Sequence, residues 1–254
     1  MLELRHITKR YKGIAAADDV SFVLEAGTVM GYLGPNGAGK STTVKVITGM
    51  IEPTHGQVLF RGRSIYDDLP GYRARLGYVP EEAQVYTHLS GLEYLQLVGR
   101  LRAMREDEIA KKGRAMLEVF GIGHAAESPI SEYSKGMKQR VLLSASLLHD
   151  PDLIVFDEPL SGLDAVTARL FKDLLLVLKR EGKAVLYISH VLEVVEQVCD
   201  RVIILAGGKV LANAAPKELT QLTALPNLEL VFAQMVQQTN TAATAEDLVK
   251  VMHG

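Results

Sequence analysis

The amino-terminal part of the sequence alternates apolar and polar residues. Leu2, Leu4 and Ile7 are separated by polar positions, and a second apolar run at residues 20–24 ends at the turn Glu25-Ala26-Gly27. A period of two is typical of strands with one buried face. This first stretch therefore predicts an antiparallel layer at the edge of the fold.

From Thr28 onward the pattern changes. Continuous apolar runs are followed by glycine or acidic turns and then by helical periodicity, which is typical of a parallel α/β sheet whose strands are buried on both faces. The runs occupy residues 29–33, 153–156, 184–188 and 202–205. We expect them to form a mostly parallel sheet.

Between Glu81 and Asp150 the apolar residues recur at helical spacing, as at Leu92, Leu95 and Val98. This interval predicts a helical insertion in the α/β core. Because the chain contains no repeat and no linker rich in Pro, Gly or Ser, one composite domain is the simplest organisation.

The domain boundaries follow from these patterns. We expect the composite domain to cover residues 1–220, with a helical subdomain at about 83–150. A hairpin at Gly207 and Gly208 and a short helix at 216–222 should complete it. Residues 221–254 form a tail of unknown role, partly helical, with a capping pattern that starts at Thr244.

Composition excludes several classes of protein. The 254 residues carry 28 Lys and Arg against 30 Asp and Glu, a net charge of −2 that argues against a nucleic-acid partner. The single cysteine, Cys199, cannot form an internal disulfide. No apolar run of about 18 residues occurs, so we expect a chain located in the cytoplasm.

A glycine-rich segment at residues 34–41, Gly-Pro-Asn-Gly-Ala-Gly-Lys-Ser, matches the phosphate-loop pattern G-x-x-x-x-G-K-[ST]. It follows the apolar run at 29–33 and precedes a helical pattern at 42–50, as this motif requires. Backbone N–H groups of such a loop point at phosphate oxygens, and the helix adds its positive end. Lys40 then reaches the β- and γ-phosphates, and the Ser41 hydroxyl contacts Mg²⁺. The residues expected to hold the phosphates are Asn36, Gly37, Ala38, Gly39, Lys40, Ser41 and Thr42.

Two adjacent carboxylates, Asp157 and Glu158, follow the apolar run at 153–156. Such a pair is costly at the end of a buried strand unless it has cationic partners. With a phosphate loop in the same chain, Asp157 is interpreted as a Mg²⁺ ligand and Glu158 as the base that polarises the attacking water.

His190 stands at the end of the run at 184–188, where ligands gather on parallel sheets. A second anion-binding pattern begins at Ser134, which offers a hydroxyl before a predicted helix, with Gly136 close behind. One nucleotide does not need two such sites. The economical interpretation is that the second one completes the phosphate site of another copy.

Together these segments resemble the ATP-binding subunit of an ABC transporter. The resemblance covers about residues 2–220 and rests on the phosphate loop, the segment from Tyr133 to Met137, the run ending at Glu158, Ser161 to Asp164, and His190. In that family, ATP is sandwiched between the phosphate loop of one subunit and the signature segment of the other. The implied fold is a P-loop NTPase core with a mostly parallel sheet, an antiparallel β layer and a helical subdomain.

The resemblance also assigns roles to particular residues. Tyr11 matches the aromatic residue that stacks on adenine, and Glu158 matches the catalytic base. Asp164 matches the segment that crosses the dimer interface, and His190 the switch that contacts the γ-phosphate. The implied catalytic set is Glu158, His190 and Lys40, and the metal set is Ser41, Asp157 and Glu81.

Two positions depart from the family pattern. Glu81 follows Tyr-Val-Pro where the family usually has glutamine, so a charged group stands at a position that contacts metal and water. In the signature segment, Lys135 and Met137 replace the usual glycine and glutamine, while Ser134 and Gly136 are kept.

The resulting hypothesis is a Mg²⁺-dependent ATPase that pairs with a second ATPase subunit, most simply as a homodimer, and drives integral membrane permease subunits. The segments at residues 78–82, 133–140 and 228–232 resemble the exporter branch, so export at the inner face of the cell membrane is expected. The alternatives are a soluble ABC-type ATPase that serves assembly or repair, and a regulatory subunit with impaired hydrolysis.

Overall fold

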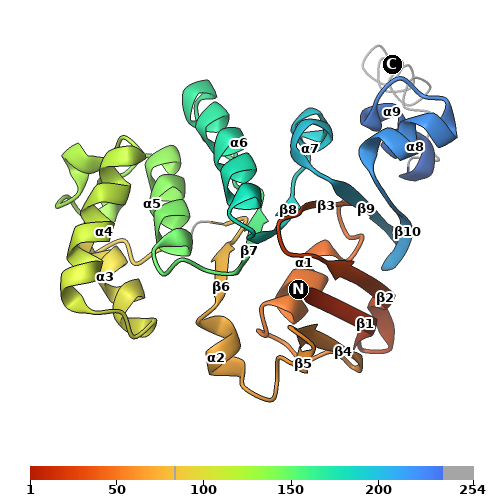
Figure 1. The fold of residues 1–254 in the computed structure, drawn as a ribbon, viewed down its shortest axis with the longest axis horizontal. Helices are drawn as coiled ribbons and strands as arrows, with labels where there is room; N and C mark the ends of the chain where they lie inside the picture. Colours follow the sequence, from red (N-terminus) through yellow and green to blue (C-terminus); the bar gives the residue numbers. More distant parts are fainter. Residues whose placement is uncertain (83, 237–254) are drawn as a thin grey trace, which may run out of the picture.

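The computed structural model describes residues 1–82 and 84–236. Two β-sheets lie one above the other, and helices cover the far side of the larger sheet (Figure 1). The larger sheet has the order β10-β9-β3-β8-β7-β6, parallel except at the β10–β9 edge. Its strands are β3 (Val29–Leu33), β6 (Leu76–Val79), β7 (Leu153–Asp157), β8 (Ala184–Ile188), β9 (Arg201–Ala206) and β10 (Lys209–Ala214).

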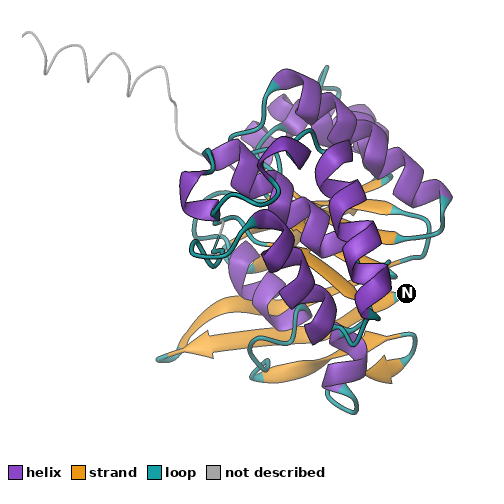
Figure 2. Cartoon of the chain, turned by 90° about the vertical axis from the view of Figure 1, so that its left-hand side faces the viewer, coloured by secondary structure: helices purple, strands orange, loops and turns teal. Residues whose placement is uncertain are grey.

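The smaller sheet is antiparallel throughout, with the order β2-β1-β4-β5. It forms the lower layer in Figure 2. The predicted antiparallel layer is therefore confirmed, and the structure adds two later strands to it. Its members are β1 (Leu2–Tyr11), β2 (Ile14–Leu24), β4 (His55–Phe60) and β5 (Arg63–Ser64).

Helices occupy the intervals between strands and most of the predicted helical interval. In chain order they are α1 (Lys40–Ile47), α2 (Leu69–Arg73), α3 (Gly91–Leu101), α4 (Glu106–Val119), α5 (Lys135–Leu147), α6 (Ala165–Arg180), α7 (Leu192–Val198), α8 (Pro216–Thr223) and α9 (Leu228–Val236). Short 3₁₀ turns lie at Gly123–Ala125 and Ile130–Glu132.

Alternate residues of the parallel strands point to two different cores, because side chains in a strand alternate between faces. On one face, Val185 and Tyr187 of β8 pack with α5, α6 and α7. On the other, Leu186 and Ile188 pack with α1 and the antiparallel sheet. Both faces are buried, which explains why these strands appear as uninterrupted apolar runs in the sequence.

Helices α3, α4 and α5 lie in the interval predicted as a helical insertion (Figure 1). Leu95 of α3 and Leu117 of α4 belong to the same hydrophobic core as Phe156 of β7. Tertiary packing therefore joins these helices to the sheet. The subdomain limits at about 83 and 150, and the domain limit at 220, stay predictions.

Some elements were not predicted from the sequence, because their own residues carry only a weak pattern. Strand β6 has only four residues, and the first half of β4 is exposed and begins His-Gly-Gln, without alternation. Helix α1 begins at Lys40, two residues before the predicted start. In the tail, α8 and α9 are helical, whereas the helix predicted after Thr244 lies outside the described residues. Within the described part of the chain, every helix is too short or too polar to cross a lipid bilayer.

Candidate functional site

The phosphate loop joins β3 to α1 through a backbone that tolerates little substitution. Gly39, the N-cap of α1, has φ 102°, and a Cβ at this position would lie 2.1 Å from the carbonyl oxygen of Ala16. A Cβ at Gly34 would lie 2.5 Å from the carbonyl oxygen of Leu205. Because both contacts are with backbone, the loop needs glycine at these two positions.

The side chain of Lys40 folds back over this loop. Its ammonium group donates to the carbonyl oxygens of Gly34, at 2.6 Å, and Pro35, at 3.1 Å. Partial burial lowers the pKa of Lys40, although Glu158, Asp157 and Glu81 act in the opposite direction. The loop therefore presents one cation in front of the free N–H groups at the start of α1.

The carboxylates lie where β7 leaves the parallel sheet. Asp157 is the last residue of β7 and is 7% exposed. Burial, with added repulsion from Glu81 and Glu158, raises the pKa of Asp157 to about 6. Burial also raises the pKa of Glu158. Like charges held together in this way need a counter-charge, which a cation or a proton can supply.

His190 lies against Glu158. Its backbone N–H donates to Oε2 of Glu158 at 3.4 Å, and its imidazole Nε2 lies 3.3 Å from Oε1. That Oε1 atom is buried without a hydrogen-bond partner within the described residues. Strands β7 and β8 are neighbours, so the two residues meet across the carboxyl ends of adjacent parallel strands.

One cavity of about 200 Å³ brings most of the predicted site together. It is lined by the phosphate loop, including Pro35, by carboxylates from two segments and by His190, and Ala16 is an addition that no sequence pattern indicated. The lining residues are Ala16, Pro35, Asn36, Gly37, Ala38, Gly39, Lys40, Ser41, Thr42, Glu81, Asp157, Glu158 and His190.

The donors around this cavity fit a Mg²⁺ ion that arrives with a nucleotide. Within residues 1–82 and 84–236, no three His, Cys, Asp or Glu side chains are arranged to hold a metal ion. Mg²⁺ commonly takes one or two protein ligands, with water and phosphate oxygens completing its coordination. The Ser41 hydroxyl and the Asp157 carboxylate, groups of the kind that Mg²⁺ takes as ligands, both line this cavity together with Glu81.

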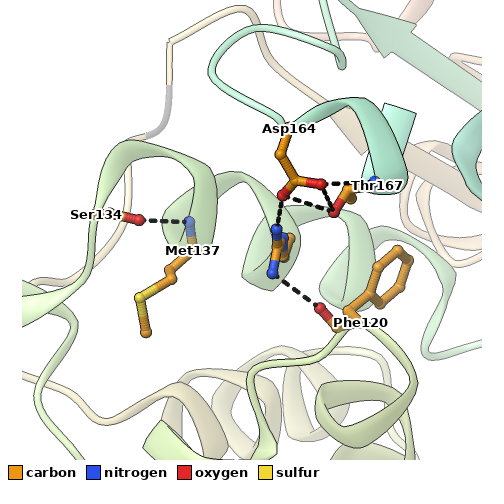
Figure 3. A network of polar contacts seen from close by, with 6 residues as sticks. Phe120, Ser134, Met137, Asp164 and Thr167 are labelled. Carbon is orange, nitrogen blue, oxygen red and sulfur yellow. Dashed lines mark hydrogen bonds and ion pairs between the residues drawn. The ribbon is translucent and has the colours of Figure 1, made fainter. Parts of the chain in front are cut away.

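Four of the predicted residues lie outside this cavity. Tyr11 is 48% exposed at the end of β1, and the ammonium of Lys9 lies 5.6 Å from its ring centroid. Ser134 caps α5 by accepting a hydrogen bond from the N–H of Met137 at 3.2 Å (Figure 3). Gly136 lies so close to the carbonyl oxygen of Gly162 that a Cβ would approach it to 2.6 Å.

Asp164 is the N-cap of α6. Its Oδ1 accepts a hydrogen bond from the N–H of Thr167 at 2.9 Å, and its Oδ2 pairs with the guanidinium of Arg140 on α5 (Figure 3). The Thr167 hydrogen bond and the Arg140 charge both lower the pKa of Asp164. The contact of Arg140 with Asp164 has no signal in the sequence, because nothing local shows that α5 and α6 begin side by side.

The parallel sheet, the phosphate loop and the helix that follows it define a P-loop NTPase. Residues 17–161 match the family model described as ABC transporter. The ABC transporter ATP-binding protein NatA of Bacillus subtilis is 33% identical over 237 residues, which is 91% of this chain and 96% of that protein.

Two solved structures are similar in fold. An ATP-binding subunit of an ABC transporter superposes with a TM-score of 0.87 at 30% identity, covering 92% of this chain and 99% of that one. A dimeric ATP-binding cassette in a post-hydrolysis state, bound to ADP and Pi, superposes with a TM-score of 0.79 at 27% identity, covering 85% and 98%. The chain belongs to the ABC transporter family, as an ATP-binding subunit with ATPase activity. The family and fold predicted from the sequence are thus confirmed.

Proposed function

We propose that two copies of this chain close on two ATP molecules, with each ATP held between the cavity of one copy and helix α5 of the other. The supporting observation is the separation of the two anion-binding elements. The phosphate loop, Glu81, Asp157, Glu158 and His190 share one cavity, whereas Ser134 and Gly136 contribute nothing to its lining. The dimeric cassette with ADP and Pi is a precedent for such a pairing in a similar protein.

In this proposal the residues of the cavity have different roles in ATP binding and hydrolysis. Lys40 and the N-terminal N–H groups of α1 bind the β- and γ-phosphates, and Ser41, Asp157 and Glu81 hold Mg²⁺. The ion would neutralise charge on the phosphate oxygens. Glu158 accepts a proton from the attacking water, and its raised pKa moves it toward the range in which a general base works well at neutral pH. His190 holds Glu158 in place and donates to the γ-phosphate.

The second copy completes the site. Its Ser134 hydroxyl and the free N–H groups at the start of its α5 bind the γ-phosphate from the opposite side. Asp164 lies at the interface between copies, and Tyr11 stacks on adenine. Tyr11 is 48% exposed, which leaves a face of its ring available for stacking.

A larger cavity of about 560 Å³ lies beside the nucleotide cavity and shares Ser41, Glu81 and Asp157 with it. Tyr94 and Val98 of α3 line its other side. We propose that this groove receives a cytoplasmic helix of the membrane permease, because a segment bound here would contact residues that also face the nucleotide. The chain would then lie at the inner face of the membrane, and the exporter-like segments favour export.

Complementation between two inactive variants tests the composite site. Lys40→Ala removes the phosphate loop's cation, and Ser134→Glu places a negative charge at the N-terminus of α5. In a mixed dimer, one site retains both intact halves, so hydrolysis should return when the two variants are mixed. Native mass spectrometry confirms that mixed dimers form. Mixed dimers without any regained hydrolysis would contradict the proposal.

A separate experiment tests the membrane partner. The tagged chain is purified from membranes solubilised in mild detergent, and bound proteins are identified by mass spectrometry. A stoichiometric protein with several membrane spans supports the transporter assignment. Val98→Asp should reduce its recovery, whereas Lys111→Met, an exposed change elsewhere in the helical segment, should not. Recovery of cytosolic partners only would instead favour a soluble ABC-type ATPase.

A further inference from the structure

The first turns of α5 hold the loop between β7 and α6 at three points. We call residues 158–164 the β7–α6 loop. The ammonium of Lys135 donates to the Ser161 hydroxyl at 2.8 Å, and the amide of Gln139 donates to the carbonyl of Pro159 at 3.1 Å. Arg140 forms the ion pair with Asp164 shown in Figure 3. Positions 135, 139 and 140 lie on one side of a helix, so all three can reach the same loop.

Lys135 is held closely against this loop. The position that a Cβ would take on Gly162 lies 3.0 Å from Cγ and 3.1 Å from Cδ of Lys135, and Gly162 has φ +79°. The aliphatic part of Lys135 therefore packs over a residue that must be glycine, while its ammonium reaches Ser161. A lysine at this position replaces a glycine of the usual signature pattern, so the contact is a feature of this chain.

The same loop determines the backbone at Glu158. The N–H of Ser161 donates to the carbonyl oxygen of Glu158 at 3.1 Å. Glu158 itself has φ 48°, a left-handed conformation that residues other than glycine adopt only where the surroundings impose it. Because the direction of the Glu158 carboxylate toward His190 depends on this backbone, contacts that hold the loop also orient the carboxylate.

We propose that Lys135 is a positioning residue for ATP hydrolysis: through Ser161 it connects the N-terminus of α5 to the backbone of Glu158. The inference rests on the proposed role of Glu158 as the general base. It adds a physical link between the end of α5 that faces the second copy and the carboxylate that acts on ATP in this copy. Lys135 acts through Ser161 and does not itself contact the reacting atoms.

Four variants of the full chain test this link in steady-state ATP hydrolysis. Lys135→Met keeps the aliphatic stem and removes the donor, and Ser161→Ala removes the acceptor. Each should lower kcat about fivefold, the effect of losing one hydrogen bond of ordinary strength, with little change in KM. The double variant should be no slower than either single one. Lys135→Arg, which keeps a donor, should restore most of the rate.

Other outcomes separate the competing explanations. Lys111→Met is the control, because the Lys111 side chain is exposed on α4 and forms no hydrogen bond or ion pair within the described residues, and its kcat should be unchanged. A loss in Lys135→Met together with normal Ser161→Ala activity would overturn the link and indicate direct contact between Lys135 and phosphate. Additive losses would also overturn it. Glu158→Gln with undiminished hydrolysis would reject the proposed base itself, independently of how the Lys135 variants behave.

Discussion

The imidazole Nε2 of His190 lies 3.3 Å from Oε1 of Glu158, while the His190 backbone N–H donates to Oε2 at 3.4 Å. One residue that follows the adjacent strand therefore approaches both oxygens of the carboxylate, with a hydrogen bond to Oε2 and an imidazole nitrogen close to Oε1. The arrangement aims Glu158 into the cavity lined by the phosphate loop. It leaves the imidazole half exposed on the same side.

Glu158→Gln should lower ATP turnover by about 10²–10⁴-fold, because the amide cannot accept a proton as a general base. ATP binding should persist, since the phosphate loop and Lys40 are unaffected. Single-turnover hydrolysis and equilibrium binding of a fluorescent ATP analogue measure the two effects separately. Unchanged turnover would contradict the assignment of Glu158.

Lys40→Ala should act on binding. The ammonium group faces the place where the β- and γ-phosphates are expected, and a charge-assisted hydrogen bond to phosphate is stronger than one between neutral groups. We expect the dissociation constant for ATP to rise at least tenfold in the same binding assay. The Glu158→Gln protein is the matched control, and equal affinity in the two variants would exclude the phosphate-loop interpretation.

Removal of Mg²⁺ should weaken ATP binding most when Glu81 is charged. With EDTA present, the carboxylates of Glu81, Asp157 and Glu158 repel the phosphates without a neutralising ion. Glu81→Gln should then bind ATP about tenfold more tightly than the unmodified chain, and the difference should shrink when Mg²⁺ is added. Glu82→Gln is the control, because Glu82 lines the neighbouring groove and not the nucleotide cavity. An equal gain in Glu82→Gln would show that general charge, and not the site, is responsible.

Asp164 should contribute to stability in two separable ways. Asp164→Asn keeps an oxygen that can accept from the N–H of Thr167 but loses the charge opposite Arg140, whereas Asp164→Ala loses both interactions. The urea midpoint should therefore fall in both variants, and further in Asp164→Ala. Circular dichroism during urea titration gives the order, and equal midpoints would mean that the cap contributes nothing.

The free energy of unfolding should decrease as the pH is lowered, and His149 should cause part of this decrease. Its Nε2 donates to the carbonyl oxygen of Leu76 at 3.1 Å, and burial, with repulsion from Arg102, lowers the pKa of His149 to about 4. Below its ordinary pKa of 6.5, the unfolded chain binds a proton that the folded chain does not, so the free energy of unfolding decreases as the pH falls toward 4.

This titration can be isolated by substitution. His149→Gln keeps a donor for Leu76 and does not titrate. Between pH 7 and pH 5, the unmodified chain should lose about 1–2 kcal/mol more unfolding free energy than the variant, as measured by urea denaturation at each pH. A parallel decline in the two proteins would show that His149 has the same pKa in the folded and unfolded states.

Much of the candidate site could be predicted from the sequence because its parts are local. The phosphate loop is one continuous segment whose glycines, lysine and serine are fixed by its own backbone geometry. Asp157 and Glu158 follow an apolar strand directly, and His190 follows another. Each is a short-range pattern, and the carboxyl ends of parallel strands necessarily lie at one edge of a sheet.

The contacts that hold Glu158 could not be predicted in this way. Lys135 and Ser161 are 26 positions apart, and Arg140 and Asp164 are 24 apart, with strand β7 between them. Nothing in either segment indicates the other as its partner. The same holds for β6, whose four residues become a strand by pairing with β7.

The sequence by itself determined which residues are candidates for binding phosphate, metal and water, because glycine freedom, charge and strand hydrophobicity are properties of short segments. Only the tertiary structure decided which of those residues share a cavity and which are left facing outward, as Ser134 is. The physical reason is that cavities, and hydrogen bonds between distant side chains, form where elements far apart in the chain pack together. That packing depends on the two cores of the parallel sheet as a whole.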